Sequence, residues 1–198
     1  MKRGLDILLS SIALLLLSPC FLLICMLIII ESRGGAFYIQ TRVGRDNQDF
    51  RLLKFRSMRK ETDKRGLLTL GDNDRRITRV GYYLRKFKID EFPQLINIIK
   101  GEMSIVGPRP EVRKYVNLYS DEQQQVLTVR PGLTDYASLH YIDEGSLLAQ
   151  ADNPEKLYIE EIMPHKIALN LEYIRNQSIG EDFKIISETL FKIVIPHK

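Results

Sequence analysis

A long apolar segment, residues 5–30, lies near the N-terminus and precedes a remainder in which charged and apolar positions alternate. A helix of about 26 residues would be about 39 Å long, which exceeds the roughly 30 Å apolar core of a bilayer. The segment therefore predicts a membrane helix. Its few polar interruptions are Asp6, Ser10, Ser11 and Ser18.

The middle of this segment carries Ser18 and Pro19, a pair that favours a helix turning back within one leaflet. Proline removes a backbone donor and kinks a helix, and a serine hydroxyl satisfies freed backbone groups. Basic residues flank both ends, with Lys2 and Arg3 before the segment and Arg33 after it. The positive-inside rule then places both ends in the cytosol. A tilted spanning helix is the alternative, because proline also occurs in spanning helices.

A cleaved signal peptide fits this segment poorly. Its apolar part would be too long, and Glu31-Ser32-Arg33 stands where small residues should mark a cleavage site. We therefore predict a re-entrant anchor over residues 1–33, built as two helical arms about a break at Ser18-Pro19. Residues 34–198 form the cytosolic or interfacial domain.

The remaining pattern predicts an α+β domain that is mostly helical. Residues 36–42 and 50–58 read as two strands of a small β-hairpin about the turn 44–47, and residues 59–79 as a polar loop. Helices are expected over residues 80–89, 92–99, 112–129, 158–174 (with a kink or boundary at Pro164) and 182–195. The apolar stripes of 80–89 and 182–195 are typical of amphipathic interfacial helices, and packing on the core is the alternative for the latter.

Charge and composition narrow the class of partner. The 198 residues carry a formal net charge of +4, and the basic excess lies mainly between Arg33 and Arg85, which suits phosphates or anionic lipid. We exclude nucleic acid because no nucleic-acid motif is present, Trp is absent and aromatic residues do not interleave with the basic ones. Cys20 and Cys25 lie in the apolar segment and the three histidines are scattered, so neither a disulfide framework nor a structural zinc site is expected.

Asp90 and Glu91 are the residues with the clearest chemistry, at the start of the predicted helix 92–99. Adjacent acids are usually only a solvated helix start, but here apolar helices flank them, Arg85 precedes them and Arg109 follows. A helix start favours a bound phosphate, and an aspartate is a competent nucleophile toward phosphorus. The second carboxylate is suited to binding a divalent cation such as Mg²⁺ or to taking up a proton.

A series of short motifs in fixed order resembles the bacterial sugar transferase family, the small monotopic phosphoglycosyl transferases. The motifs are Lys2-Arg3 with Asp6, Ser18-Pro19, Gln40-Thr41-Arg42-Val43-Gly44, Lys54-Phe55-Arg56-Ser57-Met58, Asp90-Glu91-Phe92-Pro93-Gln94-Leu95 with Asn97, Lys100-Gly101, Met103-Ser104, Val106-Gly107-Pro108-Arg109-Pro110 and Val129-Arg130-Pro131-Gly132-Leu133-Thr134. Each motif alone is weak. Their ordered occurrence is highly specific.

The resemblance implies the minimal catalytic core of that family, without the additional transmembrane domain of its larger members. It implies a monotopic enzyme on the cytosolic face of the bacterial inner membrane, in contact with its lipid. The enzyme would transfer a sugar 1-phosphate from a UDP-sugar to a polyprenol phosphate, expected to be undecaprenyl phosphate, and release UMP. This would be the first membrane step in assembling a glycoconjugate.

The resemblance also implies roles for individual residues. Asp90 would be the nucleophile that forms a covalent aspartyl phosphosugar intermediate, and Glu91 would assist through Mg²⁺ or the incoming lipid phosphate. Asp90 and Glu91 would be the metal ligands. Four basic residues would hold phosphates: Arg85, Arg109, Arg130 and, as a weaker candidate, Lys54.

The chain departs from the family pattern after Thr134. Many relatives continue with Gly-Trp-Ala-Gln-Val-Asn-Gly-Arg, whereas this chain has Asp135-Tyr136-Ala137-Ser138-Leu139-His140-Tyr141-Ile142. The familiar arginine is missing, which puts the usual sugar or nucleotide contacts of this loop in doubt. Tyr136, His140 and Asp143 are candidates for different contacts, and a loop subtype with the same role is the alternative.

Two other functions stay open from the sequence. The chain could be a catalytically silent membrane scaffold for later glycosyltransferases, although the joint presence of Asp90, Glu91, Arg85 and Arg109 argues against this. It could also be a lipid-linked phosphohydrolase that uses water as the acceptor. No motif identifies the sugar, the length of the lipid or the glycan pathway. The oligomeric state is also open, with a homodimer as one possibility.

Overall fold

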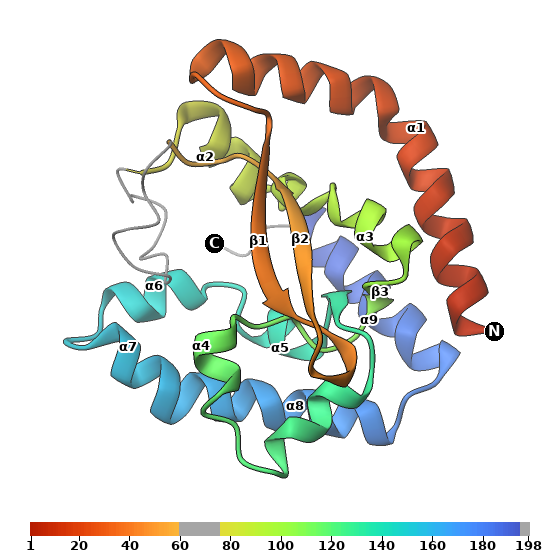
Figure 1. The fold of residues 1–198 in the computed structure, drawn as a ribbon, viewed down its shortest axis with the longest axis vertical. Helices are drawn as coiled ribbons and strands as arrows, with labels where there is room; N and C mark the ends of the chain where they lie inside the picture. Colours follow the sequence, from red (N-terminus) through yellow and green to blue (C-terminus); the bar gives the residue numbers. More distant parts are fainter. Residues whose placement is uncertain (60–75, 195–198) are drawn as a thin grey trace.

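The structure, a computed structural model, describes residues 1–59 and 76–194. They form the expected α+β fold, which is mostly helical and contains two sheets of two strands each. A long helix arches over one side of the molecule, a β-hairpin runs through its middle, and a layer of helices covers the opposite side (Figure 1).

Helix α1 (Lys2–Glu31) is continuous through Pro19. The predicted break is therefore a bend within one helix, visible about halfway along the ribbon (Figure 1), and not a gap between two helices. The Ser18 hydroxyl donates to the Leu15 carbonyl at 2.8 Å. Among the described helices, α1 alone is long and apolar enough to cross a membrane, by length and composition. Its exposed leucines, such as Leu15 at 75%, show that the helix is not a buried core element.

The predicted hairpin is confirmed. Strands β1 (Phe37–Val43) and β2 (Asp49–Phe55) pair antiparallel, with Phe37 opposite Phe55, and the 3₁₀ turn η1 (Arg45–Asn47) joins them. Asp46 and Asn47 adopt positive φ there, as these two residue types do more readily than most residues other than glycine. Of the polar loop predicted over residues 59–79, positions 60–75 lie outside the described residues.

Helix α2 (Arg79–Lys86), the 3₁₀ turn η3 (Ile89–Glu91) and helix α3 (Gln94–Lys100) follow, and Gly101 ends α3 at a φ of +95°. Asn97 joins α3 to the hairpin. Its side chain is fully buried, donates to the Arg51 carbonyl at 2.8 Å and accepts from the Leu53 N–H at 3.0 Å. Phe50, Leu52, Leu95, Ile98 and Met103 pack around this junction.

Strands β3 (Ser104–Val106) and β4 (Gly132–Thr134) form a short parallel pair. The two segments cross immediately beyond β3 at a pair of glycines. A Cβ on Gly132 would lie 2.1 Å from the Gly107 nitrogen, and a Cβ on Gly107 would lie 2.5 Å from the Arg130 carbonyl oxygen. Only glycine permits this approach, which explains both motif glycines by packing.

The single helix predicted over residues 112–129 is wrong. The segment contains a short helix, α4 (Arg113–Val116), and a separate 3₁₀ turn, η4 (Gln123–Thr128). Ser120 and Gln123 cause the interruption, because the Ser120 hydroxyl accepts from the Gln123 N–H at 3.3 Å and the Gln123 side chain accepts from the Ser120 N–H at 2.9 Å. This reciprocal capping box starts a new turn.

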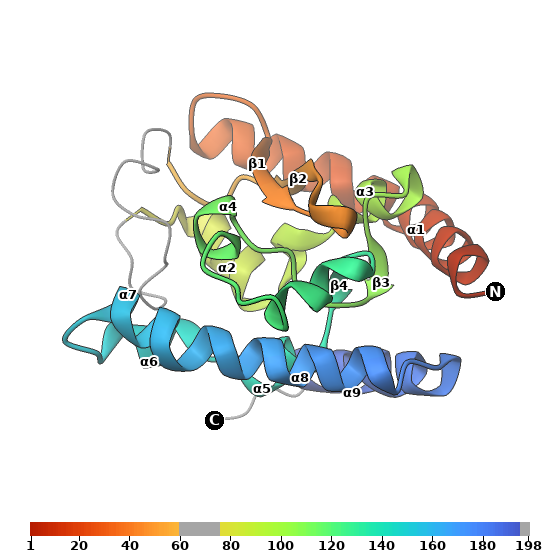
Figure 2. The same cartoon turned by 60° about the horizontal axis from the view of Figure 1, so that its bottom comes forward.

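The remaining helices are α5 (Tyr136–His140), α6 (Glu144–Ala149), α7 (Pro154–Leu157), the π-helical turn η5 (Tyr158–Ile162), α8 (Met163–Arg175) and α9 (Ile179–Val194). The boundary expected at Pro164 is confirmed, because the π turn gives way to α8 there. Helix α9 begins three residues earlier than predicted, where the Ser178 hydroxyl accepts from the Glu181 N–H. Figure 2 shows α8 and α9 along one face and α1 along the other.

Candidate active site

Asp90 and Glu91 lie in the 3₁₀ turn η3, directly before α3, as the sequence predicts. Both are buried, with 6% and 8% of their surface exposed. Lys88 precedes them at a φ of +56°, and this left-handed residue separates α2 from the turn. The apolar neighbours Ile89 and Phe92 pack onto Ile28, Phe55 and Leu84 and so hold the turn in place.

Glu91 is neutralised by two cations from other parts of the chain. Its Oε1 accepts from Lys54 Nζ at 2.9 Å and from Arg109 Nη2, and its Oε2 accepts from Arg109 Nη1 at 3.3 Å. Burial alone would raise the pKa of Glu91, but the charges and hydrogen bonds of Arg109 and Lys54 outweigh it and hold that pKa well below its ordinary value. Glu91 is therefore a fixed anion.

Asp90 has the opposite environment. Among the described residues its carboxylate accepts no hydrogen bond and makes no ion pair. Burial raises the pKa of Asp90, and the charge of Glu91 adds to this, while Lys54 and Arg85 act in the other direction. The result is a carboxylate whose oxygens are not committed to any partner. Such a group is suited to bind a cation or to attack an electrophile.

Lys54 and Arg109, the two cations that bind Glu91, come from different segments of the chain. Lys54 projects from β2, and burial lowers the pKa of its amine. Arg109 follows the glycine crossing, where the Gly107 N–H donates to the Thr134 carbonyl at 3.1 Å and the Gly132 N–H donates to the Pro108 carbonyl at 2.9 Å. The tight crossing thus fixes the start of the segment that carries Arg109 to Glu91.

The other two predicted phosphate-binding residues, Arg85 and Arg130, do not pair with Glu91 as Lys54 and Arg109 do. Arg85, in the last turn of α2, is near enough to Asp90 for its charge to act on the pKa of that carboxyl. Arg130 lies at the other end of α3, where its Nε donates to the Gly101 carbonyl at 2.9 Å. The structure therefore brings Asp90, Glu91, Lys54 and Arg109 together, with Arg85 near enough for its charge to act on Asp90, whereas Arg130 binds the C-terminal end of α3.

The divergent loop forms α5 and the turn after it. Tyr136 donates from its hydroxyl to Glu181 in α9, under the Lys184 amine. His140 packs edge-on against His165 with ring centroids 5.0 Å apart. Asp143 is exposed and precedes α6. Tyr136 and His140 thus contact α9 and α8.

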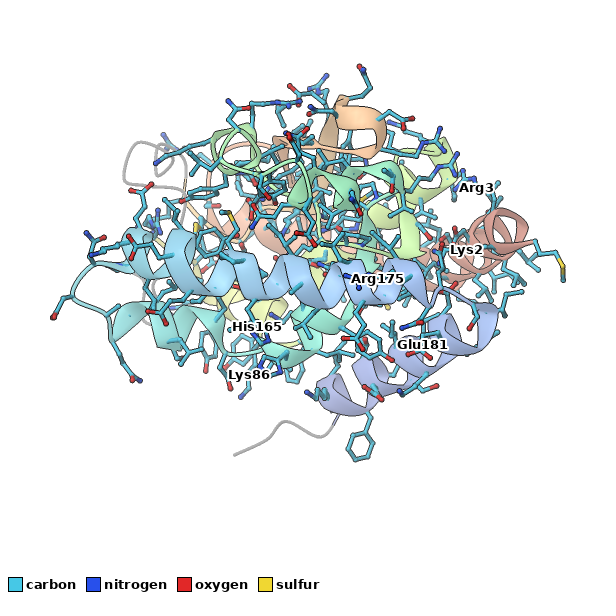
Figure 3. The ribbon with its side chains drawn as sticks, turned by 90° about the horizontal axis from the view of Figure 1, so that it is seen from below. Lys2, Arg3, Lys86, His165, Arg175 and Glu181 are labelled. Carbon is cyan, nitrogen blue, oxygen red and sulfur yellow. The ribbon has the colours of Figure 1, made fainter. Side chains whose placement is uncertain are left out.

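Polar residues at the N-terminal end of α1 hold it against the domain, a role that sequence reasoning missed. Lys2 Nζ donates to Asp182 at 2.5 Å and Arg3 donates to the Ile98 carbonyl at 2.7 Å. Asp6, the one acid inside the apolar run, is buried and accepts from the Ser104 hydroxyl at 2.8 Å. Figure 3 shows Lys2 and Arg3 at the same end of the molecule as Glu181 near the start of α9.

The C-terminal end of α1 is held as firmly. Arg56 is buried and donates to the Ser32 and Arg33 carbonyls at 2.7 and 3.2 Å, as a cation at a helix C-terminus should. Glu31 accepts from the N–H groups of Arg79 and Val80 at 2.7 and 2.9 Å and so caps α2. The basic motif residue Arg56 therefore serves the anchor. Two features of the sequence could have indicated these attachments of α1: Asp6 as a lone acid in the apolar segment, and Arg56 as an arginine within a motif.

The described side chains also limit where a metal ion could sit. Among these residues, no three His, Cys, Asp or Glu side chains converge. Asp90 offers free oxygens, whereas a Mg²⁺ ion at Glu91 would compete with Lys54 and Arg109 for the same oxygens. Because Mg²⁺ is commonly held by one or two carboxylates together with substrate phosphates, Asp90 fits such an ion.

The long apolar helix indicates a membrane-associated protein, and the α+β domain attached to both ends of that helix holds a buried acid pair among cations. The model of the bacterial sugar transferase family matches residues 1–196. The chain therefore belongs to the bacterial sugar transferase family.

Named relatives are similar over almost the whole chain. The UDP-N-acetylgalactosamine-undecaprenyl-phosphate N-acetylgalactosaminephosphotransferase of Aeromonas hydrophila is 39% identical, over 98% of this chain and 43% of its own length. The exopolysaccharide production protein ExoY of Rhizobium meliloti is 36% identical, over 96% and 83%. The UDP-glucose:undecaprenyl-phosphate glucose-1-phosphate transferase of Escherichia coli is 35% identical, over 97% and 40%. The chain thus spans less than half of two of these relatives.

Proposed function

We propose that this chain is a phosphoglycosyl transferase that moves a sugar 1-phosphate from a UDP-sugar to undecaprenyl phosphate. The relatives from Aeromonas hydrophila and Escherichia coli carry both substrates in their names, and the ExoY relative is named for exopolysaccharide production. The product would be the lipid-linked first sugar of a polysaccharide or other glycoconjugate.

The contrast between Asp90 and Glu91 is the observation that carries this proposal. Glu91 is occupied by Lys54 and Arg109, and Asp90, one residue away, is buried with uncommitted oxygens. The cations hold Glu91 as an anion and present positive charge beside Asp90. A donor pyrophosphate needs that positive charge, and a nucleophilic carboxylate needs free oxygens.

The reaction would proceed in two displacements. An Asp90 carboxylate oxygen attacks the phosphorus that bears the sugar, the bond from that phosphorus to the bridging oxygen breaks, and UMP leaves with the bridging oxygen and its electron pair. An oxygen of undecaprenyl phosphate then attacks the aspartyl phosphorus and releases Asp90. Lys54, Arg85 and Arg109 stabilise charge on the phosphoryl oxygens, and Arg130 stays a candidate for a more distant phosphate.

Mg²⁺ is the expected metal, held by Asp90 and by oxygens of the donor phosphates, with Glu91 as the second predicted ligand. When bound, the ion would neutralise charge on the pyrophosphate. Asp90 would hold such an ion, and the burial of Asp90 would limit the access of water to the aspartyl phosphosugar, which is an acyl phosphate.

The anchor supports a re-entrant, monotopic placement on the cytosolic face of the inner membrane. Lys2 contacts Asp182 and Glu31 contacts the start of α2, so both ends of α1 are attached to one polar body. A spanning helix would put one end across the bilayer and break one of these contacts. A shallow helix would instead set Asp90 near the depth at which a soluble donor and a lipid phosphate meet.

A mass measurement tests the proposal. Detergent-solubilised protein is incubated with Mg²⁺ and a panel of UDP-sugars, and the intact protein is then weighed. Wild type should gain one sugar phosphate and release UMP, Asp90→Asn should gain none, and the exposed control Asp152→Asn should behave as wild type. The absence of both adduct and UMP with every donor would favour a silent scaffold. Steady UMP release without a lipid acceptor would indicate a phosphohydrolase.

A further inference from the structure

A second buried carboxylate, Asp135, contacts Arg109 besides Glu91. Asp135 is completely buried, and each of its carboxylate oxygens accepts a different backbone hydrogen bond. Its Oδ1 accepts from the Ser138 N–H at 2.7 Å, and its Oδ2 accepts from the Arg109 N–H at 3.0 Å. The first bond caps α5. The second crosses to a different segment of the chain, the one that carries Arg109 to Glu91.

The bond from Asp135 holds the main chain of Arg109 from one side. Proline has no backbone N–H, so Arg109 supplies the single main-chain donor of Pro108-Arg109-Pro110, and Asp135 accepts it. On the other side, the Pro110 carbonyl accepts from Arg42 Nη1 at 3.2 Å. The main chain of Arg109 is thus fixed between a buried carboxylate and a guanidinium.

The guanidinium of Arg109 depends on this support. The side chain is 36% exposed, and its charged end is held by Glu91. Because an arginine side chain has many rotamers, the ion pair keeps its geometry only while the main chain stays in place. The charge of Glu91 and, more weakly, that of Asp135 raise the pKa of Arg109, so the buried carboxylate also favours the cation.

We propose that Asp135 is a positioning residue, which fixes the main chain of Arg109 and through it the Arg109–Glu91 ion pair for phosphosugar transfer. The proposal rests on the proposed function and deepens it. It also assigns a role to the divergent loop. In this chain the residue after Thr134 is a carboxylate, and it supports Arg109.

Two substitutions separate the two hydrogen bonds of Asp135. Asp135→Ser keeps a good cap for α5 but has no second oxygen for Arg109, whereas Asp135→Ala removes both bonds. We expect the rate of adduct formation to fall about tenfold or more in both variants, since small displacements of a catalytic group are costly. The melting temperature should fall further in Asp135→Ala than in Asp135→Ser. A fully active Asp135→Ser would overturn the proposal, because the carboxylate would then serve only the cap.

A double-mutant cycle tests whether the effect passes through Arg109. In an Arg109→Ala background, which should itself be slow, Asp135→Ser should lower the rate further by less than about twofold, because the residue it supports is gone. An undiminished effect in that background would show that Asp135 acts by another route.

A companion cycle needs no donor. Glu91→Gln and Asp135→Ser are combined, and the midpoint of urea unfolding is measured for each variant. Their effects should be non-additive if Asp135 supports the Arg109–Glu91 pair, and additive effects would contradict the proposal. Should wild type fail to form an adduct with any donor, the proposed function fails, while this cycle still decides the role of Asp135.

Discussion

The Lys54 amine lies 2.9 Å from the Glu91 carboxylate, while the neighbouring Asp90 carboxylate has no such partner among the described residues. Two acids adjacent in sequence therefore differ in kind. Glu91 is held ionised by its two cations, and Asp90 is buried with unpaired carboxylate oxygens. This division of roles is the physical basis of the proposed chemistry and makes the two residues separable by experiment.

Glu91→Gln should lower stability, whereas Asp90→Asn should not. Glu91→Gln removes the anion that pairs with Lys54 and Arg109. Because the Arg109 side chain is 36% exposed and is screened by solvent, the free energy of unfolding should fall by about 2 kcal/mol at pH 7. The low pKa of Glu91 contributes stability above the unfolded-state value of about 4.3, and this contribution is lost as the pH falls through the folded pKa. Asp90→Asn removes a buried charge without partners, so its stability should equal or exceed that of wild type.

Urea unfolding of the three proteins at pH 7 measures this difference. Asp46→Asn, at an exposed turn residue whose positive φ suits asparagine, is the matched control and should change little. Equal losses in Asp90→Asn and Glu91→Gln would contradict the assigned roles.

The rate of the first displacement should depend on pH in a bell-shaped manner. Asp90 must be ionised to attack, and its pKa is raised above the usual 3.8 by burial, so the rate should fall on the acid side at a pH above that value. Lys54 must be charged, and burial lowers its pKa from 10.5, so the rate should also fall on the alkaline side below pH 10.5.

Single-turnover adduct formation measured across the pH range gives both limbs. Lys54→Arg is the informative variant, because an arginine keeps its charge throughout the range, and it should remove the alkaline limb. If that limb persists unchanged in Lys54→Arg, another group titrates there.

The glycine crossing should tolerate no side chain. Gly132→Ala would place a Cβ 2.1 Å from the Gly107 nitrogen, and the main chain would have to move. We expect a loss of about 2–3 kcal/mol in the free energy of unfolding and a parallel loss of adduct formation, because Arg109 follows the crossing. Gly35→Ala is the matched control, since nothing lies within 4 Å of its Cβ position. A stable and active Gly132→Ala would show that the crossing is looser than described.

Local signals predicted most of the fold. The hairpin, the C-terminal glycine of α3 and the boundary at Pro164 follow from turn and cap chemistry within a few residues. The prediction of one helix over residues 112–129 was wrong because it overlooked such a local signal. Ser120 and Gln123 form a capping box, which apolar periodicity does not reveal. Sequence patterns therefore predict a turn or a helix boundary reliably where residues close in sequence determine it.

The site depended on contacts distant in sequence. Lys54 and Arg109 lie 37 and 18 residues from Glu91. Arg109 could be noted from the sequence only as a basic residue that follows the acid pair, and Lys54 was indicated only by the resemblance to a family. Nothing local shows that Arg130 turns to the Gly101 carbonyl, or that Arg56 holds the end of α1. A basic residue in a motif can bind a phosphate or the carbonyl groups at the end of a helix. Tertiary packing determines which of these two roles it has.

The topology of α1 is the last prediction. Both ends should face the compartment of the domain, because Lys2 pairs with Asp182 and Glu31 caps α2. In a background of Cys20→Ala and Cys25→Ala, single cysteines are placed by Gly4→Cys, Gly35→Cys and Glu122→Cys. The first two sites have nothing within 4 Å of a Cβ, and all three are exposed. In spheroplasts, a membrane-impermeant maleimide should label none of the three, and after lysis it should label all of them. Labelling of Gly4→Cys alone in intact spheroplasts would mean that α1 spans the membrane, and the re-entrant placement would be wrong.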